Sequence, residues 1–480
     1  MTWETVIGLE VHVQLLTRSK MFCGCSAKFG DPPNTNVCPV CLGMPGALPA
    51  PNERAVRLAV RAAYALGCAV NGRSIFARKN YFYPDLPKGY QISQFEEPLA
   101  TGGRLEIVTP EPGVLTVGLT RLHLEEDAGK SFHDRVPGMT AVDFNRSGVP
   151  LIEIVSEPDL RSPAEARAYL VALKQVLHYL EVSDCNMEEG SLRVDANLSI
   201  RRPGEPLGTR TEVKNMNSFS GVERALTLER DRQVAAVERG ETIVQRTMLF
   251  DAAANEVRPM RSKEESHDYR YFPEPDLPPL VLPDGWLKAE REALPELPAA
   301  KRLRFMASFG LSAYDAGVLS GTRELAEYYE SVVAEGIEAK EAANWVMNDV
   351  LALHPEDVQR ALPPATVADV IRLVKAGTAS RQAAKRVLQE LDARSANVTL
   401  APGAALDVAT DLGLIQVQDT NQIDSWVRET LDAHPAELAR YRAGETKLMG
   451  FLVGQVMKRS KGKADPKAVS AALSVALSGP

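Results

Sequence analysis

The sequence predicts an α+β protein in which a domain built on antiparallel sheet precedes a helical region. A chain of 480 residues exceeds what one hydrophobic core usually serves, so we expect two or three domains. Residues 1 to about 290 are rich in Gly, Pro and short alternating segments, a pattern typical of strands bounded by turns. From about residue 295 Gly and Pro become rarer and apolar residues recur every 3.6 positions, which indicates helices.

The first part is expected to hold five clear strands and two helices. The strands are 8–15, 119–125, 151–155, 192–200 and 210–214, and the helices are 53–66 and 162–180. Ser162 is a good N-cap, with Pro163 at the first helical position and Glu165 at the third. The Pro-rich stretch 273–283 excludes a helix or an inner strand and is expected to be a linker or an extended wrapping segment.

The later part is expected to be helical throughout. Helical periodicity is clear in 324–333 and 366–374, and a final helical part begins near residue 403. That last part contains the apolar stretch 448–457, which is followed directly by the basic sequence KRSKGK at 458–463.

Composition indicates a soluble globular protein with an uneven charge distribution. The chain is 45% hydrophobic and 25% charged. Residues 440–480 hold eight Lys or Arg and two Asp or Glu, a net +6, so the rest carries −14 of the total of −8. No apolar run reaches the ~18 residues of a membrane span. The start, MTWE, lacks the features of a signal peptide, so the expected location is the cytoplasm, with no membrane partner.

Polar residues share one face on several predicted strands. In 8–15 alternation places Glu10, His12 and Gln14 opposite the apolar face. The equivalent residues of the other strands are Arg121, His123, Glu125 and Asp127; Glu153; and Arg193, Asp195, Asn197 and Ser199. Each face alone is most simply a solvated outer face of a sheet. Together they concentrate the hard donors that Mg²⁺ or Mn²⁺ prefers, and a cluster of Glu10, His12, Glu125 and Glu153 would repel itself without a cation.

Two loops carry cations beside aromatic or amide groups. The sequence RKNYFYPDLPKGYQ (78–91) suits phosphate contact and stacking on a base, although an aromatic loop packed over the core explains it equally well. Lys214 lies beside Asn215 and Asn217, and lysine can neutralise phosphate charge. These residues alone favour a strand that ends in an Asn-containing turn. Gly129-Lys130-Ser131 is not a P-loop, because position 124 is Leu rather than Gly.

Four of the six cysteines form two close pairs. Cys23 and Cys25 are separated by twelve residues from Cys38 and Cys41. Such pairs can surround one tetrahedral Zn²⁺, and a closed four-thiolate site would be structural. The alternative is four reduced cysteines in a loop rich in Gly and Pro.

Eight motifs in order resemble the GatB/GatE family of tRNA-dependent amidotransferase subunits. They are VIGLEVH (6–12), RKNYFYPD (78–85), LHLEEDAGK (122–130), NRSGVPLIEIVSEPD (145–159), EEGSLRVDAN (188–197), KNMNSF (214–219), DYRYFPEPD (268–276) and GFLVGQVMK (450–458). The resemblance implies a cradle domain at 1–292, a helical domain at 293–402 and a YqeY-like tail domain at 403–480.

The resemblance also implies a function within a complex. An A subunit would release ammonia from glutamine, a C subunit would complete a heterotrimer, and a misacylating aminoacyl-tRNA synthetase could join a larger assembly. This chain would use ATP and Mg²⁺, with Mn²⁺ as the alternative, to phosphorylate the side-chain carboxylate of Glu on tRNA(Gln), of Asp on tRNA(Asn), or of both. Ammonia would then displace phosphate. This chain lacks the Ser-Lys amidase signature, which agrees with ammonia from elsewhere.

The family's site residues transfer to matching positions here. Glu10, His12, Glu125 and Glu153 would be metal ligands and, with Lys79 and Lys214, catalytic residues. Contacts to ATP or the acyl adduct would come from Lys79, Tyr81, Tyr83, Asp195, Lys214, Asn215 and Asn217. Zn²⁺ would occupy the four cysteines, and Lys458, Arg459, Lys461 and Lys463 would contact tRNA. The competing hypothesis is a non-catalytic, zinc-stapled tRNA-binding scaffold, which rests on the cysteines and the basic tail alone.

Overall fold

The computed structural model describes residues 2–109, 113–260, 269–355, 357–395, 400–416, 419–460 and 462–478. The chain divides into two compact units, Met1–Pro298 and Ala299–Pro480. The division into three domains stays a prediction.

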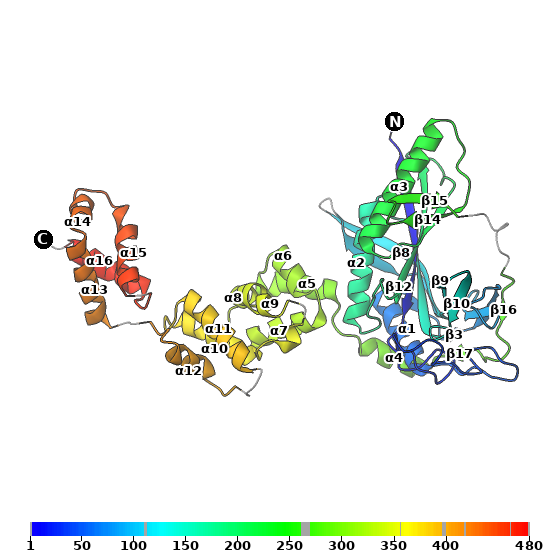
Figure 1. Ribbon diagram of the computed structural model, residues 1–480, viewed down its shortest axis with the longest axis horizontal. Helices are drawn as coiled ribbons and strands as arrows, with labels where there is room; N and C mark the ends of the chain where they lie inside the picture. The colour runs from blue at the N-terminus through cyan, green and yellow to red at the C-terminus, as the bar shows by residue number, and fades with distance from the viewer. Residues whose placement is uncertain are drawn as a thin grey trace. The chain divides into compact units, whose positions relative to one another are not determined.

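A ten-stranded sheet organises the first unit (Figure 1). Its order is β15-β14-β13-β12-β1-β11-β8-β6-β2, and β7 pairs with β8. The strands are β1 (Glu4–Gln14), β2 (Ala69–Val70), β6 (Ala100–Thr101), β7 (Arg104–Val108), β8 (Val114–Glu126), β11 (Pro150–Ser156), β12 (Leu192–Arg201), β13 (Thr211–Lys214), β14 (Thr247–Asp251) and β15 (Glu256–Pro259). The five predicted strands are confirmed as β1, β8, β11, β12 and β13, of which β12, β1, β11 and β8 are antiparallel neighbours.

One face of this sheet carries the core. Leu9, Val11 and Val13 of β1 are buried, as alternation predicts. The helices α1 (Glu53–Ala65), α2 (Pro163–Tyr179) and α3 (Phe219–Glu238) contact β8, β7 and β12 respectively. Both predicted helices are therefore confirmed, and the Oγ of Ser162 accepts a hydrogen bond from the amide of Glu165, the expected cap of α2.

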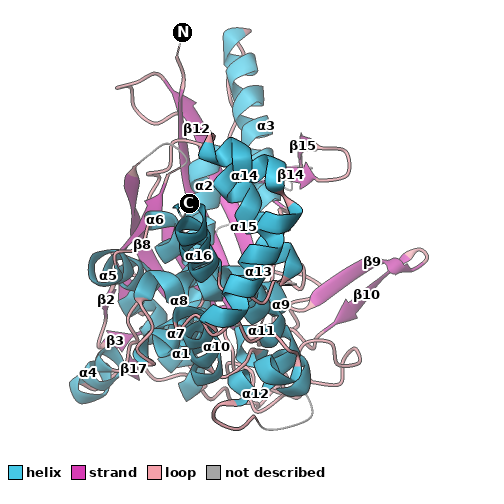
Figure 2. Cartoon of the chain, turned by 90° about the vertical axis from the view of Figure 1, so that its left-hand side faces the viewer, coloured by secondary structure: helices cyan, strands magenta, loops and turns pink. Residues whose placement is uncertain are grey.

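Smaller sheets surround the central one. β16 (Phe272–Pro273), β4 (Ala77–Asn80) and β5 (Tyr90–Ser93) form one, and β17 (Leu280–Val281) pairs with β3 (Arg73–Ser74). The Pro-rich stretch 273–283 is thus a wrapping segment with short edge strands, and α4 (Asp284–Glu292) follows it. A hairpin of β9 (Lys130–Val136) and β10 (Met139–Asp143) joins β8 to β11 and projects from the unit (Figure 2).

The second unit is helical, as predicted, and holds two apolar cores. The first core draws on α5 (Pro298–Phe309), α6 (Ala313–Leu319), α7 (Arg323–Ala334), α8 (Ala339–Trp345), a π-helical turn (Val346–Val350), α9 (Leu351–Leu353), a 3₁₀ turn (Val358–Arg360), α10 (Pro364–Lys375), α11 (Arg381–Ser395) and α12 (Ala404–Asp411). The second draws on α13 (Thr420–Ala433), α14 (Pro435–Arg442), α15 (Leu448–Arg459) and α16 (Pro466–Ser478). Among the described residues, no helix combines the length and apolarity that crossing a membrane requires.

Candidate functional site

Four neighbouring strands place polar side chains in one row on the face opposite the helices. Arg193 of β12 is paired with His12 of β1. His12 is paired with Glu153 of β11, which is paired with His123 of β8. Directly paired residues point to the same face and have their Cβ atoms about 5 Å apart. The strand register therefore brings the polar faces that the sequence predicted onto one surface.

A compact group of potential metal ligands lies at the centre of this row. His12 Nε2 is 3.6 Å from Glu125 Oε1 and 3.5 Å from Glu153 Oε2. One donor atom from each of the three residues lies within 4.8 Å of the others. The carboxylates are buried, with side-chain exposures of 3% and 9%, so they are not a solvated outer face.

The predicted ligand Glu10 lies beside this group rather than in it. It is two residues from His12 on the same face of β1, and its Oε1 accepts a hydrogen bond from Asn197 Nδ2 at 3.0 Å. Burial and the nearby charge of Glu153 raise the pKa of Glu10. The structure thus separates the four predicted ligands into three convergent ones and one neighbour.

His123 is a residue of the group that the predicted ligand set omits. Its Nε2 is 3.2 Å from Glu153 Oε2 and 3.8 Å from Glu125 Oε2, and its side chain is almost fully buried. The signal was present in the sequence, since His123 shares the alternating face of Glu125. What the sequence could not supply was the register that pairs it with Glu153.

The group is a strongly coupled set of acids and imidazoles. Burial alone would lower the pKa of His12, but its hydrogen bond with Glu153 and the charge of Glu125 raise that pKa to about 9. Burial opposes ionisation of Glu153, yet hydrogen bonds with His12 and His123 hold its pKa well below the usual range. Without a metal, imidazolium therefore balances the buried carboxylates. Two carboxylates and one imidazole are a donor set that fits Mg²⁺ or Mn²⁺.

Lys79 and an aromatic cluster cover part of this surface. Lys79 lies on β4, with its Nζ 4.7 Å from the ring centre of Tyr269. The Tyr269 ring is 6.0 Å from that of Tyr81 and 6.1 Å from that of Tyr271, edge to face in both cases. Burial would lower the pKa of Lys79, but the charge of Glu125 raises it, which places the ammonium near the metal-ligand group. Tyr83, by contrast, is 53% exposed.

A second charged group continues along the sheet. Lys214 Nζ donates to Asp195 Oδ2 at 2.7 Å and lies 3.1 Å from Glu212 Oε1. Burial would lower the pKa of Lys214, but these two carboxylates raise it. Asp195 is paired with Glu10 across β12 and β1, so this group adjoins the neighbour of the metal-ligand group.

The two asparagines that follow Lys214 are exposed. Asn215 adopts a left-handed φ of 70°, and its Nδ2 donates to the carbonyl of Phe250 at 3.0 Å. That contact stabilises the turn, as the simpler sequence interpretation expected. Asn217 stands two residues further along, just before the start of α3.

The four predicted cysteines converge. The Sγ atoms of Cys23, Cys25, Cys38 and Cys41 all lie within 4.8 Å of one another, and none forms a disulfide. Lys20, which is fully buried, places its Nζ 3.6 Å from Cys41 Sγ. A hydrogen bond with Cys23 and the charge of Lys20 lower the pKa of Cys41 to about 4. Convergent thiols with one stabilised thiolate fit a structural Zn²⁺ site.

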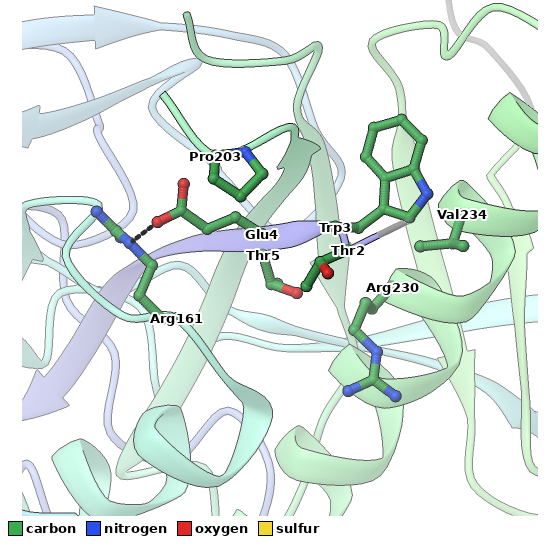
Figure 3. Close-up of a pocket in the computed structure, with 8 residues that line it drawn as sticks. All are labelled: Thr2, Trp3, Glu4, Thr5, Arg161, Pro203, Arg230 and Val234. Carbon is green, nitrogen blue, oxygen red and sulfur yellow. Dashed lines mark hydrogen bonds and ion pairs between the residues drawn. The ribbon is translucent and has the colours of Figure 1, made fainter. Parts of the chain in front are cut away.

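Two cavities lie outside the metal-ligand group. One of about 540 Å³ opens at the beginning of β1, where Trp3, Glu4, Arg161 and Arg230 line it (Figure 3). Arg161 Nε donates to Glu4 Oε1 there at 3.1 Å. It holds no predicted residue and lies roughly 25 Å along the strand from His12. A second cavity of about 200 Å³ borders the cysteine loop.

The three described cations among the four predicted in the tail are exposed. Lys458 and Arg459 end α15, and Lys463 follows in the next turn. Arg459 Nη1 donates to Glu429 Oε2 at 2.7 Å, which neutralises part of its charge. Lys461 lies outside the described residues.

Comparison with known proteins gives one family over most of the chain. Residues 5–288 match the model described as the GatB/GatE catalytic domain, and residues 327–477 match the GatB domain. Proteins named as the B subunit of aspartyl/glutamyl-tRNA(Asn/Gln) amidotransferase are similar over their full length. The one from Chlorobaculum tepidum is 51% identical over 98% of each chain, and the one from Geotalea uraniireducens is 52% identical over 100% of each.

Proposed function

The chain belongs to the GatB/GatE family, and from this premise we propose that it is the B subunit of a glutamine-dependent tRNA amidotransferase. It activates the side-chain carboxylate of Glu on tRNA(Gln), of Asp on tRNA(Asn), or of both, and converts it to the amide. The A and C subunits complete the heterotrimer, which works in the cytoplasm and which a misacylating synthetase can join. The A subunit supplies the ammonia.

The observation that carries this proposal is the buried group of His12, Glu125 and Glu153 on a rigid sheet. A carboxylate is a poor electrophile, so an amide forms only after its oxygen becomes a leaving group. The substrate carboxylate oxygen attacks the γ-phosphorus of ATP and ADP leaves. Ammonia then attacks the acyl carbon, inorganic phosphate leaves, and a proton passes from nitrogen to solvent or a nearby base.

The chain's residues suit the charge that develops in both steps. His12, Glu125 and Glu153 would hold Mg²⁺ or Mn²⁺, which when bound stabilises negative charge on phosphoryl oxygens. Lys79 presents an ammonium group beside these ligands, where it can offset charge on the phosphoryl or acyl oxygen. Tyr81, with its neighbours Tyr269 and Tyr271, offers rings on which a nucleobase can stack.

The other predicted residues have more distant roles in this proposal. Lys214 and Asp195 extend the charged surface toward the nucleotide, whereas Asn215, Asn217 and Tyr83 would contact substrate only at its edge. The four cysteines hold Zn²⁺ that ties the loop together. In the tail, Lys458, Arg459, Lys461 and Lys463 contact the tRNA backbone, where recognition is mainly electrostatic.

The test uses the complex reconstituted with the A and C subunits. Glu125→Ala and His12→Ala are each expected to lower ATP-dependent transamidation of Glu-tRNA(Gln) and Asp-tRNA(Asn) by at least about 100-fold. Glutaminase activity of the complex should remain, because ammonia release belongs to the A subunit. Glu106→Gln, on the exposed side of β7, serves as the matched control. Full transamidation by either site variant would show that the metal assignment is wrong.

A further inference from the structure

Asp127 is a buried carboxylate on which several donors converge. It follows the last residue of β8 and its side chain is 3% exposed. Arg193 donates two parallel hydrogen bonds to it, Nη1 to Oδ2 and Nη2 to Oδ1, both at 3.0 Å. Gln14 Nε2 donates to Oδ2 at 2.8 Å, and Arg146 Nε lies 3.5 Å from the same oxygen. Asp127 is thus a fixed anchor for the guanidinium group of Arg193, whereas that of Arg146 donates to the carbonyls of Ala128 and Gly129.

Arg193 reaches Asp127 across the surface that holds the metal ligands. It starts from β12, where it is paired with His12. Its positive charge acts to lower the pKa of His12. Burial would lower the pKa of Arg193 itself, but the charges of Asp127 and Glu125 raise it. Its pairing with His12 and its hydrogen bonds to Asp127 make the side chain cross the face on which His12, Glu125 and Glu153 lie.

Two cationic groups lie beside the one carboxylate of Asp127. They are the guanidinium groups of Arg193 and Arg146. The two arginine side chains are 33% and 27% exposed, so they reach solvent while the acid does not. A divalent ion held by Glu125 and Glu153 would offset their charge, and the solvent-accessible part of Arg193 would then attract an incoming anion.

The geometry of Arg193 is that of a preorganised anion site. In the described part of the chain, the guanidinium group of Arg193 donates hydrogen bonds to Asp127 alone. These two bonds use two of the five N–H groups of Arg193. A planar fork held by a carboxylate keeps the remaining donors in a fixed direction, and such donors suit phosphate oxygens.

We propose that Arg193, oriented by Asp127, binds the phosphoryl group that is transferred from the nucleotide at the metal site. Arg193 is then a binding residue for the transferred group, and Asp127 is a positioning residue. This inference rests on the proposed function, because it names the group that receives the phosphoryl charge in that reaction.

The experiment compares Arg193→Gln and Arg193→Lys in the reconstituted complex. Mn²⁺ should still bind to the full chain at one site, measured by electron paramagnetic resonance, because the metal ligands remain. The kcat/KM for ATP should fall by about 100- to 1,000-fold for Arg193→Gln. Arg193→Lys should recover only part of this loss, because an ammonium group supplies charge without the planar fork.

Two further variants separate binding from fold stability. If Arg193 only neutralises Asp127, the double variant Arg193→Gln/Asp127→Asn should regain wild-type kcat/KM; our proposal requires that it stay as low as the single variant. Because the double variant removes the buried charge too, it remains informative if the single variant unfolds. Arg201→Gln is the control, since Arg201 lies on the same strand and pairs with Glu4 away from the site.

The outcomes distinguish this inference from the function beneath it. A wild-type complex that is assembled but shows no ATP-dependent transamidation would refute the proposed function, and this inference with it. An active wild type with an Arg193→Gln variant of unchanged kcat/KM for ATP would overturn the role of Arg193 and leave the proposed function standing.

Discussion

Proton competition at His12 gives a prediction whose size follows from the structure. In the metal-free chain the pKa of His12 is raised to about 9, because Glu153 and Glu125 outweigh the effect of burial. A metal ligand must be the neutral imidazole, so below that pH the metal must first displace a proton. The perturbation is therefore pH itself, varied between 7 and 9.

The expected change in affinity is large. Well below pH 9 each pH unit weakens binding about tenfold, but at pH 9 about half of His12 is already neutral. The apparent affinity for Mn²⁺ should therefore rise by about 50-fold between pH 7 and pH 9. Stability of the metal-free chain should change in the opposite sense. A raised pKa contributes stability that is fully present below about pH 6.5 and is lost as the pH rises through 9, on the order of 3 kcal/mol.

The assay is Mn²⁺ titration without oxygen, followed by electron paramagnetic resonance at several pH values. Calorimetry in two buffers of different ionisation enthalpy should show release of about one proton per metal near pH 7.5. His12→Gln is the matched control, since glutamine offers an oxygen ligand without a titrating proton. A wild-type affinity that is the same at pH 7 and pH 9 would refute the coupling between His12 and the two carboxylates.

Three other outcomes follow from the contacts. Ser162→Ala removes the cap of α2 and should lower the stability of the first unit by about 1 kcal/mol, measured by urea unfolding; an unchanged midpoint would contradict the capping role. Cys38→Ser should reduce bound zinc, measured by atomic absorption, while equal zinc in variant and wild type would remove that site. Charge reversal of Lys458 and Lys463 to Glu should weaken tRNA binding and reduce its salt dependence, and an unaltered salt slope would exclude the tail from the contact.

Local patterns explain why much of the fold could be predicted from the sequence. Strict alternation in β1 set Leu9 and Val11 against Glu10 and His12, and the structure buries the former in the core. The start of α2 followed from Ser162 because a cap depends on residues three positions apart. The Pro-rich segment was correctly excluded from helix, but its short pairing with β3 and β4 depends on distant strands that no local pattern encodes.

The candidate site shows where such prediction ends. Alternation gives the face on which a side chain lies but not which strands are neighbours, nor their register. Glu10 and His12 share a face of β1, yet only His12 meets Glu125 and Glu153. The register pairs His12 directly with Glu153, whereas it pairs Glu10 with Val155. His123 joins the group for the same reason, since the register pairs it with Glu153. Its residue type and its place on the alternating face did not distinguish it from the other polar residues there.

The contact between Asp127 and Arg193 cannot be predicted from strand patterns. Alternation places Asp127 on the face of Glu125, but it meets Arg193 from β12, two strands beyond its own neighbour β11, and alternation does not predict that contact. Such a contact requires a long side chain that crosses the face of a twisted sheet, so it depends on tertiary geometry. The structure therefore adds the contact between Asp127 and Arg193 rather than the residues themselves, and a guanidinium fixed on the face of the metal ligands gives that contact a role in phosphoryl transfer.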